Sequence, residues 1–99
     1  MARIQLTKKA VTDLASIWNY TVDEWSEQQA EKYYNLILDT CESISENPKI
    51  GKSYEGITKD LLGLRMNMHI IFYRALPDRP IEITRILHAQ MDLKKRLKK

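Results

Sequence analysis

The first half of the chain has apolar residues at three- and four-residue steps, the spacing of one face of an α-helix. Two such runs follow one another, and they predict helices over residues 8–25 and 27–46. The first run holds Val11, Leu14, Ile17, Trp18, Thr21, Val22 and Trp25, and the second holds Ala30, Tyr33, Ile37, Cys41 and Ile44. Almost nothing separates the runs, so we expect the two helices to fold back on each other as a hairpin.

Residues that favour helix ends stand at the expected boundaries of both runs. Thr7 is placed as the N-cap of the first helix, and Ser26 begins S-E-Q-Q, a capping box in which Gln29 reaches back. Asn47-Pro48 ends the second helix, because proline disfavours the helical state of the residue before it.

The second half of the chain has the texture of β-strands. ARIQLT at residues 2–7 predicts an early short strand, whereas residues 48–60 hold turn residues without a sustained period. From Leu61 onward we expect three strands, LLGLRM, HIIFYRA and IEITRIL, with hairpin turns between them. A short C-terminal helix that frays into a basic tail follows Ala89. This order predicts an α+β fold in one domain over residues 1–99, with the helical hairpin on one face of a small antiparallel sheet.

Composition narrows the class of protein. The chain is 43% hydrophobic and 29% charged, too apolar for disorder, and it has no apolar run long enough to cross a membrane. No signal-peptide pattern precedes the first element, so a cytoplasmic protein is expected. Cys41, the one cysteine, lies on a helical apolar stripe and is expected to be a buried thiol. The spacing of the histidines predicts no zinc site, and no cofactor-binding motif occurs.

The net charge of +3 is unevenly distributed. Residues 1–47 hold four Lys/Arg and eight Asp/Glu, a net −4, while residues 48–99 hold twelve and five, a net +7. The basic half favours a polyanionic or acidic partner, although two solvated faces of opposite sign account for the same count.

Two arginines fall within the expected strands. Alternation predicts one row of Ile70, Phe72 and Arg74, and another of Ile81, Ile83, Arg85 and Leu87. A buried guanidinium is costly unless it is paired. Either the rows end at the sheet margin, where the arginines meet Glu55, Asp60 or Glu82, or they form an anion-binding surface.

His88 raises the question of nucleic-acid cleavage. A guanidinium can stabilise charge on a phosphate, and an imidazole can serve as general acid or base. A second acid–base group is still needed, and alternation places Tyr73 opposite Arg74. The i, i+4 spacing of His88 and Asp92 favours a helix-surface contact over a catalytic dyad.

Trp18 and Trp25 lie two turns apart on the first expected helix. They either pack as core against the sheet or belong, with Tyr33 and Leu36, to an exposed groove for a partner's helix. The basic tail is likewise either a solubilising end or a docking arm.

At this point the residues resemble a known family, the ParE toxins of the ParE/RelE toxin superfamily from bacterial type II toxin–antitoxin systems. The resemblance spans nearly the whole chain and rests on A-x-x-D-L-x-x-I-W-x-Y-T-x-x-x-W within residues 7–25, Gln29-Ala30 with Tyr33, Glu46-Asn47-Pro48, Ile50-Gly51-Lys52, Leu64-Arg65, HIIFYR at residues 69–74 and RILHAQMD at residues 85–92. One departure is the turn Met66-Asn67-Met68, where many relatives carry glycine with a cation.

The resemblance implies a two-helix hairpin packed on an antiparallel sheet. It also implies a toxin that poisons DNA gyrase, blocks replication and is neutralised by a ParD-like antitoxin whose C-terminal segment wraps around it. The RelE-like branch instead cleaves messenger RNA on the ribosome, and Arg65, Arg85 and His88 lie where its catalytic residues could fall.

We therefore expect a gyrase inhibitor that acts by binding, with no catalysis, metal or cofactor, and that meets DNA only through gyrase or antitoxin. A ribosome-dependent endoribonuclease and a non-toxic antitoxin-binding relative are the alternatives. The residues expected at the target surface are Arg65, Arg74, Arg85, His88, Met91, Asp92, Lys94, Lys95, Arg96, Lys98 and Lys99. Those expected to bind the antitoxin, in a toxin–antitoxin hetero-oligomer, are Trp18, Trp25, Tyr33 and Leu36.

Overall fold

The chain folds as an α+β structure, which a computed structural model describes for residues 4–97. Along the chain come β1 (Ile4–Leu6), α1 (Lys8–Glu24), α2 (Glu27–Glu46), β2 (Lys52–Ser53), β3 (Leu62–Met66), β4 (His69–Arg74), β5 (Ile81–His88) and α3 (Leu93–Leu97). The expected α+β architecture is confirmed, and both long helices end within one residue of their predicted boundaries. The expected start of the first strand at residue 2 lies outside the described residues.

The sheet has the strand order β1-β5-β4-β3-β2. β3, β4 and β5 form the antiparallel meander that the sequence predicts, and β1 joins it by parallel pairing with β5. β2 was not expected, because residues 48–60 show no strand period; its two residues pair with Gly63 and Leu62 of β3. None of the helices described here is long and apolar enough to cross a membrane.

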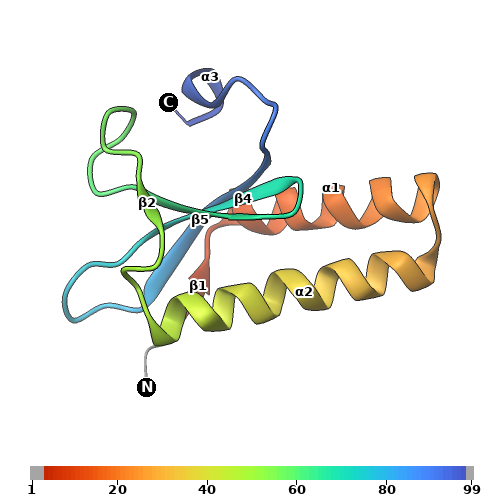
Figure 1. The fold of residues 1–99 in the computed structure, drawn as a ribbon, viewed down its shortest axis with the longest axis horizontal. Helices are drawn as coiled ribbons and strands as arrows, with labels where there is room; N and C mark the ends of the chain where they lie inside the picture. Colours follow the sequence, from red (N-terminus) through yellow and green to blue (C-terminus); the bar gives the residue numbers. More distant parts are fainter. Residues whose placement is uncertain (1–3, 98–99) are drawn as a thin grey trace.

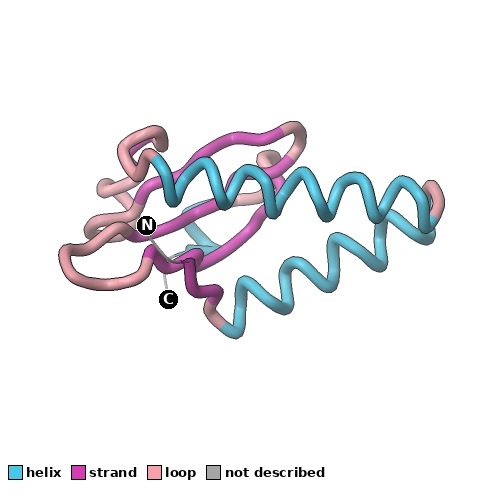
Figure 2. Tube along the Cα trace, turned by 90° about the horizontal axis from the view of Figure 1, so that it is seen from below, coloured by secondary structure: helices cyan, strands magenta, loops and turns pink. Residues whose placement is uncertain are grey.

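Side-chain caps determine where both helices of the hairpin begin. The Thr7 hydroxyl accepts the backbone N–H of Ala10 at 3.1 Å, and the Ser26 hydroxyl accepts that of Gln29 at 3.0 Å. α1 and α2 cover one face of the sheet, and their closed end projects beyond it (Figure 1 and Figure 2). Trp25 lies at this projecting end with 74% of its surface exposed, so the interpretation of Trp25 as sheet-facing core is wrong.

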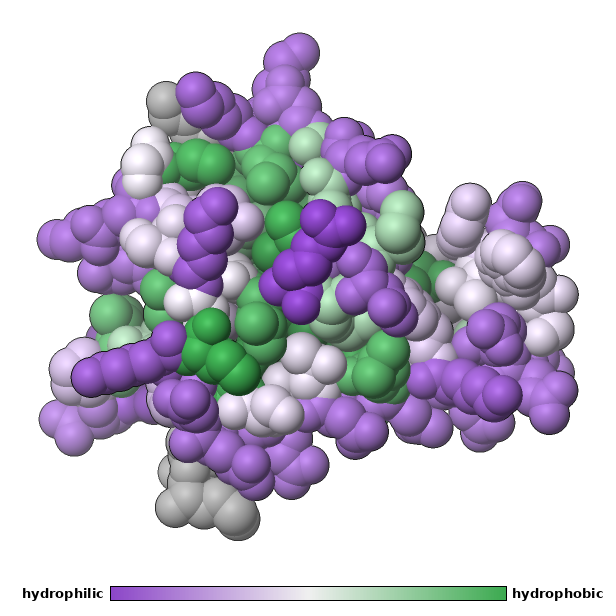
Figure 3. Space-filling model, viewed as in Figure 1, coloured by the Kyte–Doolittle hydropathy of each residue, from purple (hydrophilic) through white to green (hydrophobic). Residues whose placement is uncertain are grey.

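Two apolar clusters lie on opposite faces of the sheet. The larger one joins the hairpin to the sheet through Ala10, Ile37, Cys41, Ile44, Met66, Ile71, Tyr73, Ile81, Ile83 and Ile86. The smaller one consists of Leu61, Ile70, Phe72 and Leu87, covered by Tyr54, Ala89, Leu93 and Leu97. The face away from the hairpin is therefore not open: α3 and the loop that carries Tyr54 pack on it. Figure 3 shows green apolar patches between purple side chains over the body of the molecule, with a paler hairpin end.

Cys41 is buried, as expected, and burial raises the pKa of its thiol to about 11.

A β-bulge interrupts the alternation of β5. Phe72 pairs with Arg85 and Tyr73 with Ile83, so Thr84 is left unmatched between them. Ile83 consequently packs toward the hairpin, whereas Leu87 packs in the cluster on the other face. The predicted single row of Ile81, Ile83, Arg85 and Leu87 is therefore wrong, because one extra residue reverses the faces beyond it.

Tyr73 ties the loop after α2 to the centre of the sheet. Its ring is fully buried, its hydroxyl donates to the carbonyl of Pro48, and it accepts the N–H of Gly51, both at 2.8 Å. A Cβ atom at Gly51 would lie 2.5 Å from that hydroxyl, so the close approach requires glycine. Burial raises the pKa of Tyr73, which matches a structural phenol.

We expect Tyr73→Phe to lower the free energy of unfolding by about 1–3 kcal/mol, because it leaves the part-buried N–H of Gly51 and carbonyl of Pro48 without a partner. Chemical denaturation of wild type and variant measures the loss. Tyr20→Phe is the matched control, since Tyr20 is 65% exposed and removal of its hydroxyl should change stability little. Equal stability of the Tyr73→Phe protein and the wild type would contradict this account of the loop.

Candidate interaction surfaces

Arg85 is held by an aspartate of α1. Its Nε and one terminal nitrogen donate to the two carboxylate oxygens of Asp13 at 2.8 and 2.9 Å, and the same carboxylate accepts the N–H of Ile86 at 3.0 Å. The Arg85 and Asp13 side chains are only 18% and 12% exposed. The hydrogen bond to Asp13 raises the pKa of Arg85, so the guanidinium stays charged. The partner is therefore Asp13 rather than Glu55, Asp60 or Glu82, because α1 follows the edge of β5 beyond the end of β1.

Arg74 has a looser environment. Its guanidinium lies 4.0 Å from Asp60, and both side chains are more than a third exposed. Asp60 is one of the three acids considered as partners at the sheet margin, and its distance from Arg74 is at the limit of an ion pair. The Arg74 Nε atom is buried and has no hydrogen-bond partner among the described residues.

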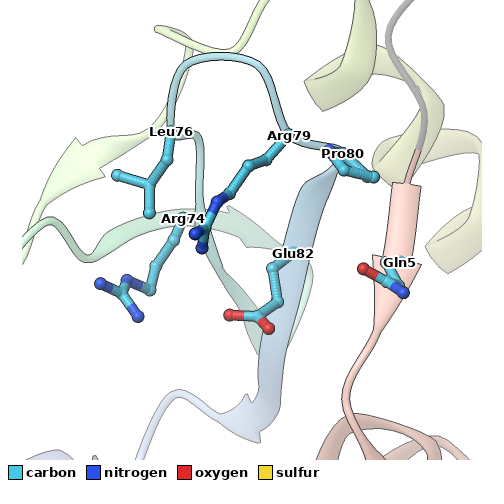
Figure 4. Close-up of a pocket in the computed structure, with 6 residues that line it drawn as sticks. All are labelled: Gln5, Arg74, Leu76, Arg79, Pro80 and Glu82. Atoms are coloured by element: carbon cyan, nitrogen blue, oxygen red, sulfur yellow. The ribbon is translucent and has the colours of Figure 1, made fainter.

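A shallow pocket of about 400 Å³ opens beside Arg74. Figure 4 shows Arg79 and Glu82 extending toward the same space, with Gln5 of β1 on the other side of β5 and the Arg74 guanidinium directed away from them. The pocket is lined by two cations and one carboxylate, so its net charge is positive.

A second hollow of about 420 Å³ lies on the other side of Arg74, and we call it the cationic groove. It is bounded by the first turn of α1, the loop before β3, strands β4 and β5, and α3. Its lining residues are Thr7, Lys8, Lys9, Thr58, Leu61, Arg74, Thr84, Arg85, Arg96 and Leu97. Sequence reasoning missed Lys8 and Lys9 because they belong to the acidic half of the chain.

A third hollow of about 470 Å³, the histidine groove, lies between α1 and the far end of β5. It is lined by Ser16, Ile17, Tyr20, His69, His88, Gln90 and Met91. His69 and His88 are cross-strand partners whose ring centroids are 5.4 Å apart. No Lys, Arg, Asp or Glu of the described residues lines this groove.

Hydrogen bonds hold both imidazoles in place. The Tyr33 hydroxyl lies 2.6 Å from His69 Nδ1, and the N–H of Gln90 donates to His88 Nδ1 at 3.1 Å. Burial, and then the charge of His88, lower the pKa of His69 to about 4, so His69 is neutral at pH 7. His69 therefore contributes a neutral, hydrogen-bonded imidazole to the histidine groove.

The three residues considered for nucleic-acid cleavage do not converge. Arg65 is opposite Ile70, which is opposite Leu87, so Arg65 shares the face covered by α3. His88 instead lines the histidine groove beside α1, on the hairpin side of the sheet. Arg85 is bound to Asp13. No single substrate atom could meet all three side chains in this arrangement.

His88 and Asp92 also do not share a helix. His88 ends β5, whereas the Asp92 carboxylate accepts the N–H of Lys95 at 3.4 Å at the start of α3. The expected helix-surface contact between them is therefore wrong, because the chain turns at Ala89-Gln90 before the helix begins.

The remaining candidate target residues are distributed over two surfaces. Met91 lies with His88 in the histidine groove, whereas Lys94, Lys95 and Arg96 lie exposed on α3. Lys98 and Lys99 lie outside the described residues.

The four candidate antitoxin residues do not form one continuous groove. Trp18 packs edge-on against Tyr34 with ring centroids 5.8 Å apart, and Trp25 projects at the closed end of the hairpin. Leu36 is 41% exposed on α2, whereas the Tyr33 hydroxyl points to His69 under the hairpin. Trp18, Trp25 and Leu36 are therefore accessible along the hairpin. Tyr33 instead helps to pack the hairpin on the sheet.

We expect Asp13→Ala to destabilise the protein by about 3 kcal/mol, because it leaves the largely buried charge of Arg85 without a counter-ion and the N–H of Ile86 without its acceptor, while Arg85 keeps only the Arg96 carbonyl. Thermal unfolding compares it with Asp23→Ala, which removes an exposed acid from the same helix. A similar small effect of both changes would show that the Asp13 contacts do not stabilise the fold.

We expect acid to destabilise the protein partly through His69. Its pKa is lower in the folded state, about 4, than the ordinary value of 6.5, so protons bind the unfolded chain preferentially between these values. Stability is complete above pH 6.5 and falls as the pH drops toward 4. His69→Asn keeps an acceptor for Tyr33 and removes this titration, so its melting temperature should fall less steeply over the same interval. Parallel pH profiles would disprove the assignment.

Comparisons with known proteins agree on one family. The family described as "ParE toxin of type II toxin-antitoxin system, parDE" matches residues 4–93. "Toxin ParE1" of Mycobacterium tuberculosis (strain ATCC 25618 / H37Rv) is 31% identical over 96 residues, covering 97% of this chain and 98% of that protein. "Toxin ParE1" of Caulobacter vibrioides is 31% identical over 97 residues, covering 98% and 99%.

A solved structure supports the same fold. A chain described as "Chromosomal ParDE TA system from P. aeruginosa" superposes with a TM-score of 0.78 at 20% identity, covering 91% of this chain and 98% of that one. At that identity the superposition shows the fold alone, while the family and full-length sequence matches carry the assignment. The chain belongs to the ParE toxin family of type II toxin–antitoxin systems.

Proposed function

We propose that this toxin inhibits DNA gyrase by binding, without chemistry of its own, and that a ParD-like antitoxin neutralises it in the cytoplasm. The observation that carries the proposal is the separation of Arg65 and His88 on opposite faces of the sheet, with Arg85 bound to Asp13. General acid–base catalysis requires its groups within hydrogen-bond reach of one substrate. A binding toxin has no such requirement and can act by stabilising one state of the enzyme it inhibits.

The cations of α3 support a binding role toward an acidic target. Leu93 and Leu97 pack on the cluster below, so Lys94, Lys95 and Arg96 are displayed outward on a short, anchored helix. Arg65 adds an exposed cation on the same face of the sheet, where its Nε is held by the carbonyl of Asn67 at 2.9 Å. Such a surface fits gyrase or the DNA that gyrase holds, so contact with DNA would occur through that enzyme.

The hairpin supports a separate role toward the antitoxin. Trp18, Trp25 and Leu36 present aromatic and aliphatic surface along the helices, and none of them belongs to the buried core. Exposed aromatic side chains are typical anchors of protein interfaces. We therefore infer a hetero-oligomer in which the antitoxin contacts the hairpin while the face with α3 meets the target.

Induction of the protein in bacteria, with DNA, RNA and protein synthesis followed separately, tests the target. We expect DNA synthesis to fall first and the DNA-damage response to rise, and the purified protein to inhibit supercoiling by gyrase. The triple change of Lys94, Lys95 and Arg96 to Gln should weaken that inhibition about tenfold or more, equivalent to about 1.4 kcal/mol. The matched control neutralises Lys49, Lys52 and Lys59, three exposed lysines between α2 and β3, and should act like wild type.

His88→Ala separates binding from ribonuclease action. Under the binding proposal this variant loses one groove contact and keeps most of its inhibition. Messenger RNA cleavage with continued DNA synthesis, abolished by His88→Ala in a folded protein, would instead establish the endoribonuclease. Absence of any growth defect on induction would establish a non-toxic relative.

A further inference from the structure

The Arg85 guanidinium bonds to more than the aspartate of α1. Its Nε and one terminal nitrogen donate to the Asp13 carboxylate at 2.8 and 2.9 Å, and its other terminal nitrogen donates to the backbone carbonyl of Arg96 at 3.2 Å. Asp13 belongs to α1, Arg85 to β5 and Arg96 to α3. One side chain of the sheet therefore connects α1 to α3.

The short helix α3 depends on contacts with the rest of the protein. It has five residues, and isolated helices below about 12–15 residues are marginal in water. Leu93 and Leu97 pack it on the apolar cluster, but burial of apolar surface is non-directional and does not by itself fix the rotation of the helix. The last carbonyls of a helix also lack partners inside it. The bond from Arg85 to the Arg96 carbonyl meets both needs, because it is directional and lies at the C-terminal end of α3.

Asp13 makes this arrangement electrostatically favourable. α3 carries Lys94, Lys95 and Arg96 in succession, and an unpaired cation close to them would repel all three. The Arg85 and Asp13 side chains are 18% and 12% exposed, so the two opposite charges are paired away from most of the solvent. The pair has no net charge, and Arg85 can donate to α3 without adding to the repulsion there.

The two partners require an arginine at this position. A guanidinium offers five donors on a rigid planar fork, so it can bond to partners on different edges at once. An ammonium offers its donors from a single nitrogen atom. Asp13 accepts from Nε and one terminal nitrogen, whereas the Arg96 carbonyl accepts from the other terminal nitrogen. A lysine could keep the ion pair with Asp13, but it could not reproduce this division between α1 and α3.

We propose that Arg85 is a positioning residue for target binding, which holds α3 through the Arg96 carbonyl in the orientation that presents its cations to the target. The inference rests on the proposed function, since α3 is part of the surface assigned there to the target. The sequence placed Arg85 among the residues that contact the target. Its nitrogen atoms are instead bonded within the protein, so its effect on the target is transmitted by α3.

The variant Arg85→Lys tests the proposal. It keeps the positive charge beside Asp13 and loses the bond to the Arg96 carbonyl. The Arg96 N–H, which donates to the Asp92 carbonyl at 3.1 Å, should then exchange with deuterium about tenfold faster or more in nuclear magnetic resonance, because α3 opens locally. Inhibition of gyrase supercoiling by the folded variant should weaken about tenfold, because a binding surface that is no longer pre-organised must be ordered on binding.

Two controls separate the orientation of α3 from charge and stability. Arg79→Lys makes the same substitution at an exposed arginine between β4 and β5, and it should match wild type in both measurements. Tyr73→Phe lowers stability from the opposite face of the sheet, and it should keep wild-type inhibition and Arg96 exchange at a temperature where it is folded. Equal loss of inhibition in Tyr73→Phe and Arg85→Lys would show an effect of stability alone and overturn the proposal.

The wild-type protein provides a test that needs no variant. A guanidinium bonded on two edges rotates slowly, so the terminal N–H groups of Arg85 should give separate resonances at low temperature. A single averaged resonance would show that the guanidinium is not held and would overturn the proposal.

The outcomes also distinguish this inference from the proposed function. A wild-type protein that does not inhibit gyrase would refute the proposed function. Wild-type exchange at Arg96 in the Arg85→Lys protein would instead refute the anchoring of α3. Faster exchange with full inhibition would refute the link between the orientation of α3 and the target. Either of these last two results leaves the proposed function standing.

Discussion

The arrangement of helices and sheet depends on the hydrogen bonds that the Asp13 carboxylate of α1 accepts from Arg85 and Ile86 of β5. β1 pairs with β5 only as far as Ile83, after which the edge of β5 must find another partner. The start of α1 supplies that partner. Thr7 donates hydrogen bonds to the backbone carbonyls of Ile83 and Thr84. Asp13 accepts hydrogen bonds from the N–H of Ile86 and the guanidinium of Arg85. The bulge at Thr84 brings these groups within hydrogen-bond distance, so the irregular strand and Asp13 together satisfy the edge of β5 beyond β1.

Two tyrosines complete the attachment of the hairpin to the sheet. Tyr33 reaches His69 from α2, and Tyr73 reaches the loop after α2 from β4. With Asp13 they place polar contacts at three points around the apolar cluster of the hairpin side. Buried aliphatic residues drive the association of the two layers, while these directional bonds select one relative orientation. The grooves on either side of β5 then have defined walls.

Local features of the sequence predicted most of the fold. Helix periodicity with Thr7, Ser26 and Asn47-Pro48 placed both helix boundaries correctly, because caps act within one turn. The faces of β5 were not predictable by alternation, since a bulge has no reliable local signature. The Arg85–Asp13 pair joins positions 72 residues apart, and nothing in the spacing identifies it. Trp25 looked like core because a helical stripe does not reveal where the sheet beneath it ends.

The segregation of charge also gives the molecule a direction. Residues 4–47, which form β1 and the hairpin, hold three Lys/Arg and eight Asp/Glu, a net −5. Residues 48–97, which form the rest of the sheet and α3, hold ten and five, a net +5. The protein is therefore an electric dipole, with its negative end at the hairpin and its positive end at the sheet and α3. In the field of a negatively charged partner it turns its sheet and α3 forward and its hairpin away before any contact is made. The encounter is thus oriented at long range, and salt that shortens the Debye length removes this orientation before it weakens the buried contacts.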